Sequence, residues 1–570
     1  MNNIVFVLLR RLHAPLIALI IVYAVSVLGF VLIPGMDDQG QPYRMNFFHA
    51  FYFVSFMGTT IGFGEIPYPF TDAQRMWTVV SIYATVFAWL YAIGSMLSAM
   101  QDPAFRELLT SSAFRRSIRR INGPFYLICG YGDTGSMLVK ALTEVDKRAV
   151  VVEIDQERIN ALELEDLKHF VPGLCADAVH PDTLIEAGLK LPNCIGVIAL
   201  TNNDAVNLRV AISSKLLNPS QLTIARAESH DFEANIASFG TDHIINPFDI
   251  FAGRLAMALH SPGTYLLHEW MASAPHEPLT EPLFPPIGKW VLCGYGRFGK
   301  AVHERLRKES VQVRIIEAKP EITDAPSDVI IGRGTEAVTL QLAGIEDAVG
   351  VVAGTDDDGN NLSILMTSRE LNPDLFMVAR QNSRHNDAVF QAANLDLIMQ
   401  RGSIIGHKIF ALIQSPMLDT FLRAAREQDN DWANELISRI SGITATEAPV
   451  TWELNISEED FPAMYAAARS RERIQLWQLY RDPRNREEVL PCIPLFCERS
   501  DRQILLPDDD TKIFPGDRIL FCGQAGAHSM MEWISGNHNV LNYIQTGEEH
   551  PSGYLWRLMT GRNKKVRHQS

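Results

Sequence analysis

Two long apolar runs near the start of the chain restrict its fold more than any other feature. Residues Ala14–Ile33 and Met76–Met100 are each long enough to cross about 30 Å of hydrocarbon as an α-helix. A cleaved signal peptide is the alternative for the first run. That run is long for a signal peptide, however, and a turn at Pro34–Asp38 follows it instead of a small-residue cleavage site. The sequence therefore predicts two membrane spans.

Positively charged residues lie before the first span and after the second one. Arg10 and Arg11 precede the first span, and a group of arginines follows the second one: Arg106, Arg115, Arg116, Arg119 and Arg120. Because short loops rich in Lys and Arg stay on the cytoplasmic side, this distribution puts both termini in the cytoplasm. We expect a multi-pass protein of the cell (inner) membrane, embedded in the lipid bilayer.

The segment between the spans holds an aromatic-rich stretch, Met45–Gly58, which is too short to cross a membrane. Its length suits a half-membrane helix that leads into the following loop, Thr59–Glu65. Irregular backbone at membrane depth is tolerated where it lines a polar path. The alternative is a hairpin that packs on the outer membrane surface.

The loop Thr59–Glu65 suits a ring of inward-facing backbone carbonyls. Successive carbonyls point to one side only if the backbone alternates in handedness, and Gly62 and Gly64 adopt positive φ without a Cβ penalty. Thr60 adds a hydroxyl at the inner end, and Glu65 is expected to place an acidic ring at the outer mouth.

This segment resembles the T-V-G-Y-G-D signature of K+ channels, with Ile61, Phe63 and Glu65 as departures. The resemblance implies that Thr60, Ile61, Gly62 and Phe63 bind K+ and that Gly64 completes the filter. One chain supplies a quarter of each carbonyl ring, so a homotetramer is implied. Because Phe63 lacks the tyrosine hydroxyl, a channel that discriminates weakly among monovalent cations is the alternative.

The second span has no glycine near its middle, and its single glycine, Gly94, lies close to the cytoplasmic end. We therefore expect the gate near Tyr91–Leu97 rather than at a mid-helix hinge. An Asp at one of these apolar positions is expected to raise the open probability.

Composition restricts the remainder of the chain. The 570 residues carry a formal net charge of -15, mostly in the soluble part, which argues against a nucleic-acid partner. The seven cysteines have neither metal-ligand nor disulfide spacing. Cys129 and Cys293 each end an apolar strand pattern and are expected to be small core residues.

The soluble part contains an internal repeat. Leu127–Gly135 and Val291–Gly299 share the pattern of a strand, a G-x-G-x-x-G turn and a helix start, and each has a Glu 18 residues beyond its third glycine, Glu153 or Glu317. That layout is typical of dinucleotide binding, where the acid binds ribose hydroxyls. The alternative is that the fold is retained as a scaffold and the glycines serve only the turn.

The repeat continues downstream at one constant offset. Thr201, Asn207–Leu208 and Ala225–Arg226 correspond to Thr355, Asn361–Leu362 and Ala379–Arg380. The repeats resemble regulator-of-K+-conductance (RCK) domains, and residues 446–525 resemble the small α+β subdomain of that family. The whole chain resembles prokaryotic two-span K+ channels with two tandem RCK domains, in which eight lobes form a cytoplasmic gating ring.

The expected fold is a membrane α-helical pore domain, with two spans and a re-entrant pore helix, followed by two Rossmann-like α/β lobes and an α+β subdomain. The expected boundaries are a pore domain at 1–105, a linker at 106–121, lobe 1 at 122–270, a Pro-rich linker at 271–287, lobe 2 with a helical extension at 288–445, the α+β subdomain at 446–525 and a tail at 526–570.

The two lobes differ where a nucleotide would bind. Asp133 in lobe 1 corresponds to Arg297 in lobe 2, and Ala176-Asp177-Ala178 corresponds to Gly332-Arg333-Gly334. The cations favour lobe 2 for NAD or an adenine nucleotide. The expected lobe 2 site comprises Gly294, Gly296, Arg297, Phe298, Gly299, Glu317, Lys319 and Arg333, and the corresponding lobe 1 site comprises Gly130, Gly132, Gly135, Glu153 and Asp177.

Ca2+ is a second candidate ligand, because some relatives of the resembled family bind it. Asp204 and Glu228 fall near the acidic positions used there, and Asp356, Asp357 and Asp358 form a local acidic run. Surface acids are more often simply solvated. His230, His243, His260 and His268 show no ligand spacing.

Other functional classes fit less well. A membrane-tethered NAD-dependent oxidoreductase would need a substrate domain with an acid/base pair and has no use for the filter. A regulatory subunit for a separate transporter would not carry its own pore. We therefore expect a ligand-gated K+ channel and not an enzyme.

Overall fold

The computed structural model describes residues 2–101, 113–273, 279, 281–444, 447–469, 474–500 and 502–548. The chain divides into two compact units, Met1–Arg120 and Ile121–Ser570, which are described separately. Part of the predicted linker at 106–121, part of the Pro-rich linker at 271–287 and the end of the tail lie outside the described residues.

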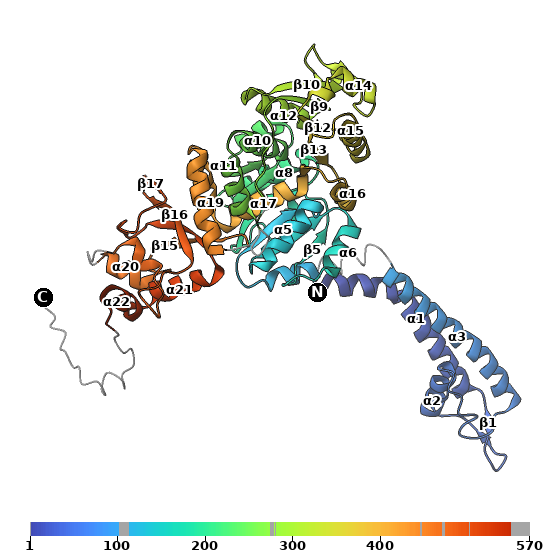
Figure 1. The fold of residues 1–570 in the computed structure, drawn as a ribbon. Helices are drawn as coiled ribbons and strands as arrows, with labels where there is room; N and C mark the ends of the chain where they lie inside the picture. Colours follow the sequence, from blue (N-terminus) through green and yellow to red (C-terminus); the bar gives the residue numbers. More distant parts are fainter. Residues whose placement is uncertain are drawn as a thin grey trace, which may run out of the picture. The chain divides into compact units, whose positions relative to one another are not determined.

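The first unit is built on two long helices. Helix α1 spans Asn2–Leu32 and helix α3 spans Asp72–Gln101, and the two lie side by side (Figure 1). Their apolar segments, His13–Leu32 and Asp72–Ser98, are long enough to cross a membrane. Both predicted spans therefore form as continuous helices, and α3 runs through Gly94 without a break.

Helix α2 (Phe47–Gly58) is the predicted short aromatic helix, and it contacts both long helices. Asn46 caps its start by accepting a hydrogen bond from His49 N at 2.8 Å. The ring of Phe53 in α2 packs edge-on against the ring of Phe30 in α1 and against that of Phe70. The ring centroids are 4.9 and 4.8 Å apart, respectively. This aromatic packing fixes α2, and with it the loop that follows.

Lobe 1 is a six-stranded parallel sheet in the order β5-β4-β3-β6-β7-β8. Its strands are β3 (Phe125–Cys129), β4 (Arg148–Glu153), β5 (Gly173–Cys175), β6 (Cys194–Ala199), β7 (Leu222–Arg226) and β8 (His243–Ile245). The helices along this part of the chain are α5 (Asp133–Glu144), α6 (Gln156–Leu164), α7 (Pro181–Glu186), α8 (Asp204–Leu217), α9 (His230–Ser238), α10 (Pro247–His260) and α11 (Pro262–Ala272). The strand order changes direction at β3, as in dinucleotide-binding folds.

Lobe 2 repeats this topology in the order β11-β10-β9-β12-β13-β14, again all parallel. Its strands are β9 (Lys289–Cys293), β10 (Gln312–Glu317), β11 (Ile330–Ile331), β12 (Gly350–Ala353), β13 (Phe376–Gln381) and β14 (Leu397–Gln400). Its helices are α12 (Arg297–Lys308), α13 (Pro320–Thr323), α14 (Ala337–Leu342), α15 (Asp358–Leu371), α16 (Asp387–Ala392), α17 (Arg401–Gln414), α18 (Pro416–Ala425) and α19 (Asn430–Thr444). The predicted repeat is thus present in the fold.

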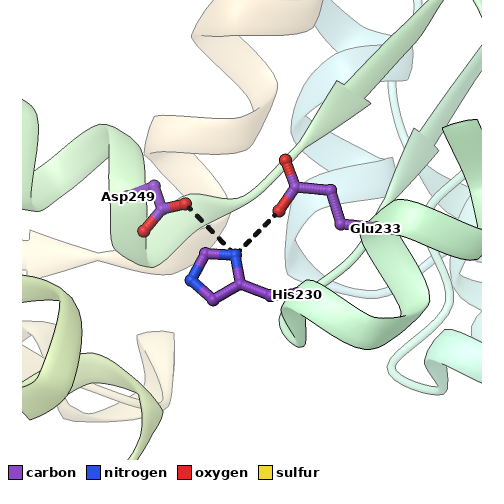
Figure 2. Close-up of side chains that lie close together, drawn as sticks. All are labelled: His230, Glu233 and Asp249. Carbon is purple, nitrogen blue, oxygen red and sulfur yellow. Dashed lines mark hydrogen bonds and ion pairs between the residues drawn. The ribbon is translucent and has the colours of Figure 1, made fainter.

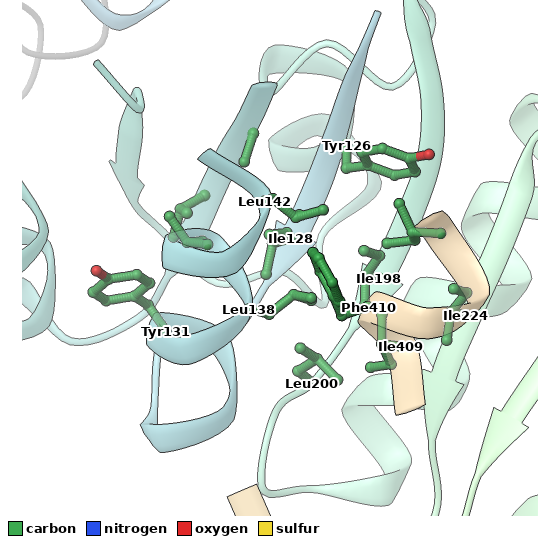
Figure 3. Packing of buried hydrophobic residues seen from close by; sticks show 14 of the residues in the cluster. Tyr126, Ile128, Tyr131, Leu138, Leu142, Ile198, Leu200, Ile224, Ile409 and Phe410 are labelled. Atoms are coloured by element: carbon green, nitrogen blue, oxygen red, sulfur yellow. The ribbon is translucent and has the colours of Figure 1, made fainter. Parts of the chain in front are cut away.

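The two lobes exchange a helix. Helix α17 follows the lobe 2 sheet but packs on α5 of lobe 1, where Ile409 and Phe410 join the core around Ile128 (Figure 3). In return, α10 follows the lobe 1 sheet and buries Phe248 and Phe251 in the core of lobe 2. Each lobe therefore takes a helix of the other into its hydrophobic core, and neither core is complete without the other lobe.

The C-terminal subdomain is a four-stranded antiparallel sheet in the order β15-β18-β16-β17. Its elements are β15 (Val450–Asn455), α20 (Pro462–Arg469), β16 (Cys492–Arg499), β17 (Arg502–Leu505) and β18 (Arg518–Gly523). The predicted tail also belongs to it, since α21 (Ala525–Gly536) and α22 (His538–Thr546) place Met531, Ile534 and Leu541 in the same core.

Candidate functional site

The loop after α2 has the backbone alternation that a ring of carbonyls requires. Thr60, Gly62 and Gly64 have φ angles of 61°, 67° and 104°, whereas Ile61 and Phe63 between them are not in the left-handed region. Two hydrogen bonds hold the loop to the end of α2, from Thr60 N to Met57 O at 3.1 Å and from Ile61 N to Phe56 O at 3.0 Å. The sequence indicated positive φ at the two glycines but not at Thr60.

The ring of Phe63 is held by another aromatic ring. It packs edge-on against Phe56 of α2, with the centroids 5.5 Å apart. Phe56 is buried, and Tyr52 packs against it in turn. This contact supports the loop through apolar packing at the position where the K+ channel signature has a tyrosine.

The carboxylate of Glu65 is bound within its own chain, whereas the sequence predicted that it forms an acidic ring at the outer mouth. Its carboxylate accepts a hydrogen bond from Phe70 N at 2.7 Å and one from Arg75 Nε at 2.9 Å. Arg75 lies in the first turn of α3, so Glu65 ties the end of the loop to the second span. Its negative charge is matched by a cation of the same chain.

The glycine-rich turns of the two lobes have matching geometry. Gly130 and Gly294, the first glycines, have φ angles of 106° and 95°. A Cβ at the third glycine would lie 2.1 Å from Gly130 O in lobe 1 and 2.0 Å from Gly294 O in lobe 2, so Gly135 and Gly299 permit the close approach of helix to strand. These turns are the backbone arrangement that lets a pyrophosphate reach a helix N-terminus.

The two predicted ribose acids hold these turns. Glu153 accepts a hydrogen bond from Tyr131 N at 2.5 Å, and Glu317 accepts one from Tyr295 N at 2.6 Å. Both carboxylates lie at the end of the second strand of their sheet and line a cavity.

The cavity of lobe 1 has a volume of about 350 Å³. Besides Gly130, Gly132 and Glu153, its walls include Asp177 and Arg158. A Cβ at Gly132 would lie 3.3 Å from Arg158 Nη1, which places this guanidinium over the glycine-rich turn. The sequence comparison of the lobes missed Arg158 because it comes from α6 rather than from the turn itself.

The cavity of lobe 2 is smaller, about 270 Å³, and is lined by Gly294, Gly296, Glu317 and Arg333 among others. Four residues predicted for this site are not on its walls. Gly299 packs against Gly294 O in the turn, Phe298 is fully buried in the core, and Lys319 is the N-cap residue of the short helix α13. Arg297, the fourth, pairs with a residue of lobe 1.

Arg297 forms an ion pair between the lobes. Its Nη2 atom lies 3.0 Å from Oε2 of Glu228 in lobe 1. Arg401 Nη1 lies 2.9 Å from the other oxygen of this carboxylate, and Arg226 pairs with it as well. Burial acts to raise the pKa of Glu228, but the charges of these three arginines outweigh burial and lower it.

This arrangement does not resemble the Ca2+ site expected at Asp204 and Glu228. Glu228 is surrounded by three guanidinium groups, and Asp204 accepts a hydrogen bond from the backbone N of Glu228 at 3.0 Å. The acidic run of lobe 2 is likewise engaged: Asp356 pairs with Arg380, Asp357 caps α15 and Asp358 accepts hydrogen bonds from Asn382, Ser383 and Asn386.

The structure instead brings His230 together with two acids, although its sequence spacing suggested no ligand role. His230 Nδ1 lies 3.1 Å from Glu233 and 3.9 Å from Asp249 (Figure 2). Glu233 is one turn along α9, and Asp249 comes from α10. Imidazole is not a Ca2+ ligand of choice, so this group gives no support to the Ca2+ prediction.

Two family models match the chain. The ion channel model covers residues 17–102, and the TrkA-N domain model matches twice, over residues 126–247 and 290–401. The first match covers both predicted spans and the loop between them. The other two cover the two Rossmann-like sheets, and the pore match argues against a regulatory subunit without a pore.

Two curated relatives come from Methanocaldococcus jannaschii. Potassium channel protein 1 is 24% identical over 254 residues, which are 44% of this chain and 72% of the relative. Probable potassium channel protein 2 is 25% identical over 219 residues, which are 38% of this chain and 62% of the relative. Neither is named as an oxidoreductase.

Two solved structures align with almost the whole chain. The GsuK channel is 17% identical with a TM-score of 0.47, and the GsuK channel bound to NAD is 16% identical with a TM-score of 0.46. Each alignment covers 93% of this chain and 99% of the other.

Proposed function

We propose that this chain is a prokaryotic two-span potassium channel with two tandem RCK domains and that it forms a homotetrameric, nucleotide-gated K+ pore in the cell membrane. The alternation of backbone handedness at Thr60, Gly62 and Gly64 carries this proposal. It lets successive carbonyls of residues 60–63 face one axis, as dehydrated K+ requires. Four chains around that axis would complete each ring of oxygens.

The side chains around the loop support selectivity for K+ over a weakly selective pore. A filter that holds its carbonyls in place needs support from behind, and here Phe63 packs on the buried Phe56. At the other end, the ion pair of Glu65 with Arg75 fixes the loop to α3. Both supports lie within one chain, so each subunit brings a loop that is already braced.

The nucleotide site that we favour lies in lobe 1 and not in lobe 2, which reverses the order expected from sequence. Arg158 lies 3.8 Å from Glu153 and 3.7 Å from Asp155, and its half-exposed guanidinium over Gly132 would also pair with phosphate. Glu153 would accept hydrogen bonds from ribose hydroxyls. Asp177 lies in the motif that closes over adenine in the resembled family. In lobe 2, Arg297 is committed to Glu228, and Arg333 is the remaining predicted cation on the cavity wall.

Gating would arise because the nucleotide binds the open and closed conformations of the channel with unequal affinity. A nucleotide shifts the pore towards the conformation in which its cavity binds it more tightly. Because the lobes share their hydrophobic cores through α10 and α17, a change in lobe 1 would be passed to lobe 2. We place the lobes and both termini in the cytoplasm, where eight lobes per tetramer would form the gating ring. Ca2+ has no part in this proposal.

The pore function is tested by the reversal potential of the purified protein in a planar bilayer under opposed K+ and Na+ gradients. We expect reversal near the K+ equilibrium potential. Reversal near zero would mean that the loop conducts without selecting, and absence of current with every nucleotide tried would contradict the channel proposal.

A further inference from the structure

A third cleft lies in the soluble unit, apart from the two nucleotide cavities. Its volume is about 570 Å³, and its walls come from α10 and α11, from the last turn of α12, from α17 and from the start of α19. Five basic side chains line it: Arg254, Arg305, Lys308, Lys408 and Arg426. Asp249, Glu309 and Asp429 are the acids on the same walls.

Several of these charges have partners outside the cleft. Lys408 pairs with Asp419, Arg254 with Glu269 and Lys308 with Glu304. Of the acids, Glu309 pairs with His260, and Asp429 accepts a hydrogen bond from Trp432 N. In the described part of the chain, neither Arg305 nor Arg426 has a carboxylate within 4.0 Å. These two guanidinium groups therefore line the cleft without a direct ion pair, and Asp249 and Asp419 act on Arg305 and Arg426 from a longer distance.

Two helices begin at this cleft. Ser261 precedes α11, and its hydroxyl lies 2.7 Å from that of Thr264 in the first turn. Asn430 begins α19 and accepts a hydrogen bond from Gly263 N at 2.8 Å. Ser261, Thr264 and Asn430 all line the cleft. Ser261 is also the C-cap residue of α10, so the anion-favouring start of α11 lies beside the end of another helix, and the basic side chains are what favours an anion in this cleft.

Two buried nitrogens on the walls lack an acceptor. His268 is only 6% exposed, and its Nε2 lies 3.3 Å from Arg426 Nη2. Because arginine only donates, Nε2 must accept and the ring proton sits on Nδ1. That donor, like Nε of Arg254, has no hydrogen-bond partner among the described residues. Burial, followed by the charges of Arg254, Arg426 and Lys408, holds the pKa of His268 well below its usual range.

We propose that this cleft is a binding site for a small phosphate-bearing anion, held by Arg305 and Arg426 at the N-terminal ends of α11 and α19. Guanidinium groups match the geometry of phosphate oxygens, and helix N-termini supply further donors. The anion would join elements that precede the lobe 2 sheet in the chain, α10 and α11, to elements that follow it, α17 and α19. It would therefore stabilise the packing of the exchanged helices.

Gly253 provides a way to test the site without disturbing the core. It lies on α10 at the cleft wall, and a Cβ there would meet no atom within 4 Å. Gly253→Glu adds a negative charge beside the basic side chains, and Gly253→Gln adds the same bulk without the charge. Both remove a helix-interior glycine, so neither is expected to weaken α10.

The experiment is isothermal titration of inorganic pyrophosphate into the full-length protein in detergent, in phosphate-free buffer. Wild type and Gly253→Gln are expected to bind alike. Arg426→Gln should bind at least about tenfold more weakly because it loses a charge-assisted hydrogen bond, and Gly253→Glu should bind more weakly because its negative charge repels the anion. Arg158→Gln, in the lobe 1 cavity, should leave unchanged the component of binding that Gly253→Glu and Arg426→Gln weaken. Gel filtration and tryptophan fluorescence check that each variant is folded.

Three results would overturn the proposal. One is the absence of pyrophosphate binding to the wild type. The second is binding that Gly253→Glu and Arg426→Gln leave unchanged. The third is binding that Arg158→Gln abolishes, which would place the anion in the lobe 1 cavity. Since the nucleotide proposal rests on Arg158 and this one on Gly253 and Arg426, either can fail without the other.

Discussion

The guanidinium of Arg297 in lobe 2 lies 3.0 Å from the carboxylate of Glu228 in lobe 1. Sequence patterns suggested a phosphate ligand for the first residue and a metal ligand role for the second. The structure pairs them with each other, and the side chain of Glu228 is only 5% exposed. The pair, with Arg226 and Arg401, forms a charged junction between the lobes, in which Glu228 and Arg226 are buried and Arg297 is exposed.

Glu228→Gln is expected to destabilise the soluble unit strongly. It removes the single acid that pairs with Arg226, Arg297 and Arg401, and removing one partner of a buried ion pair costs about 3–5 kcal/mol. The measurement is denaturant unfolding of the full-length protein, followed by tryptophan fluorescence. Glu304→Gln is the control: its exposed pair with Lys308 is worth less than about 1 kcal/mol. Equal losses in the two variants would contradict a structural role of the junction.

The same junction predicts a loss of stability in acid. The arginines hold the pKa of Glu228 below its ordinary value of 4.5, against the effect of burial. The stabilisation is therefore complete above pH 4.5 and is lost as the pH falls through the lowered pKa of the folded state. The difference in unfolding free energy between wild type and Glu228→Gln should shrink as the pH falls below 4.5. A difference that stays constant over this range would be inconsistent with a charged Glu228.

Gly62→Ala should abolish K+-selective current. Gly62 has φ of 67°, and a left-handed conformation costs a residue with a Cβ about 1–2 kcal/mol, here in each of four subunits. Gly40→Ala is a matched control, because Gly40 also has positive φ (77°) and open space around its Cβ position but lies outside the filter loop. Bilayer recordings should show normal selectivity for Gly40→Ala. Retention of K+ selectivity in Gly62→Ala would argue that this backbone conformation is not used for ion binding.

The gate is expected near Tyr91–Leu97, close to the end of α3. Ile93 is 49% exposed within the single chain, so a charge there would not be forced into the core of one subunit. Ile93→Asp would hydrate a closed apolar constriction and should raise the open probability in single-channel recordings. Ile17→Asp, on an exposed part of α1, tests whether any charge in a span has this effect. Unchanged opening in Ile93→Asp would place the gate elsewhere.

Local sequence patterns predicted the elements whose cause is local. The two spans follow from apolar length, the positive φ at Gly62 and Gly64 from the absence of a Cβ, and the paired Rossmann-like sheets from the repeated glycine turns. Contacts between segments that lie far apart in the chain could not be predicted from local patterns.

Three features show why. Arg158 reaches the lobe 1 cavity from α6, Arg297 turns to a residue far away in the chain, and α10 and α17 each cover the sheet of the other lobe. The first depends on how α6 packs within lobe 1 and the other two on how the lobes pack together, and periodicity along the chain encodes neither. The helices α21 and α22 were missed for a related reason, since their apolar residues complete a core that lies upstream in the chain.

The central claim is that a nucleotide in the lobe 1 cavity controls a K+ pore made by the same chain. The most direct test records K+ current through the purified channel in a planar bilayer while NAD or ADP is added on the side of the soluble lobes. Wild type, Arg158→Gln and Arg333→Gln are compared. The last variant removes the cation from the wall of the lobe 2 cavity.

We predict that nucleotide changes the current of the wild type and of Arg333→Gln at similar concentrations. Arg158→Gln should require at least about tenfold more, because a charge-assisted hydrogen bond to phosphate is lost. A wild-type current that does not respond to nucleotide, or a response shifted by Arg333→Gln and not by Arg158→Gln, would contradict the account.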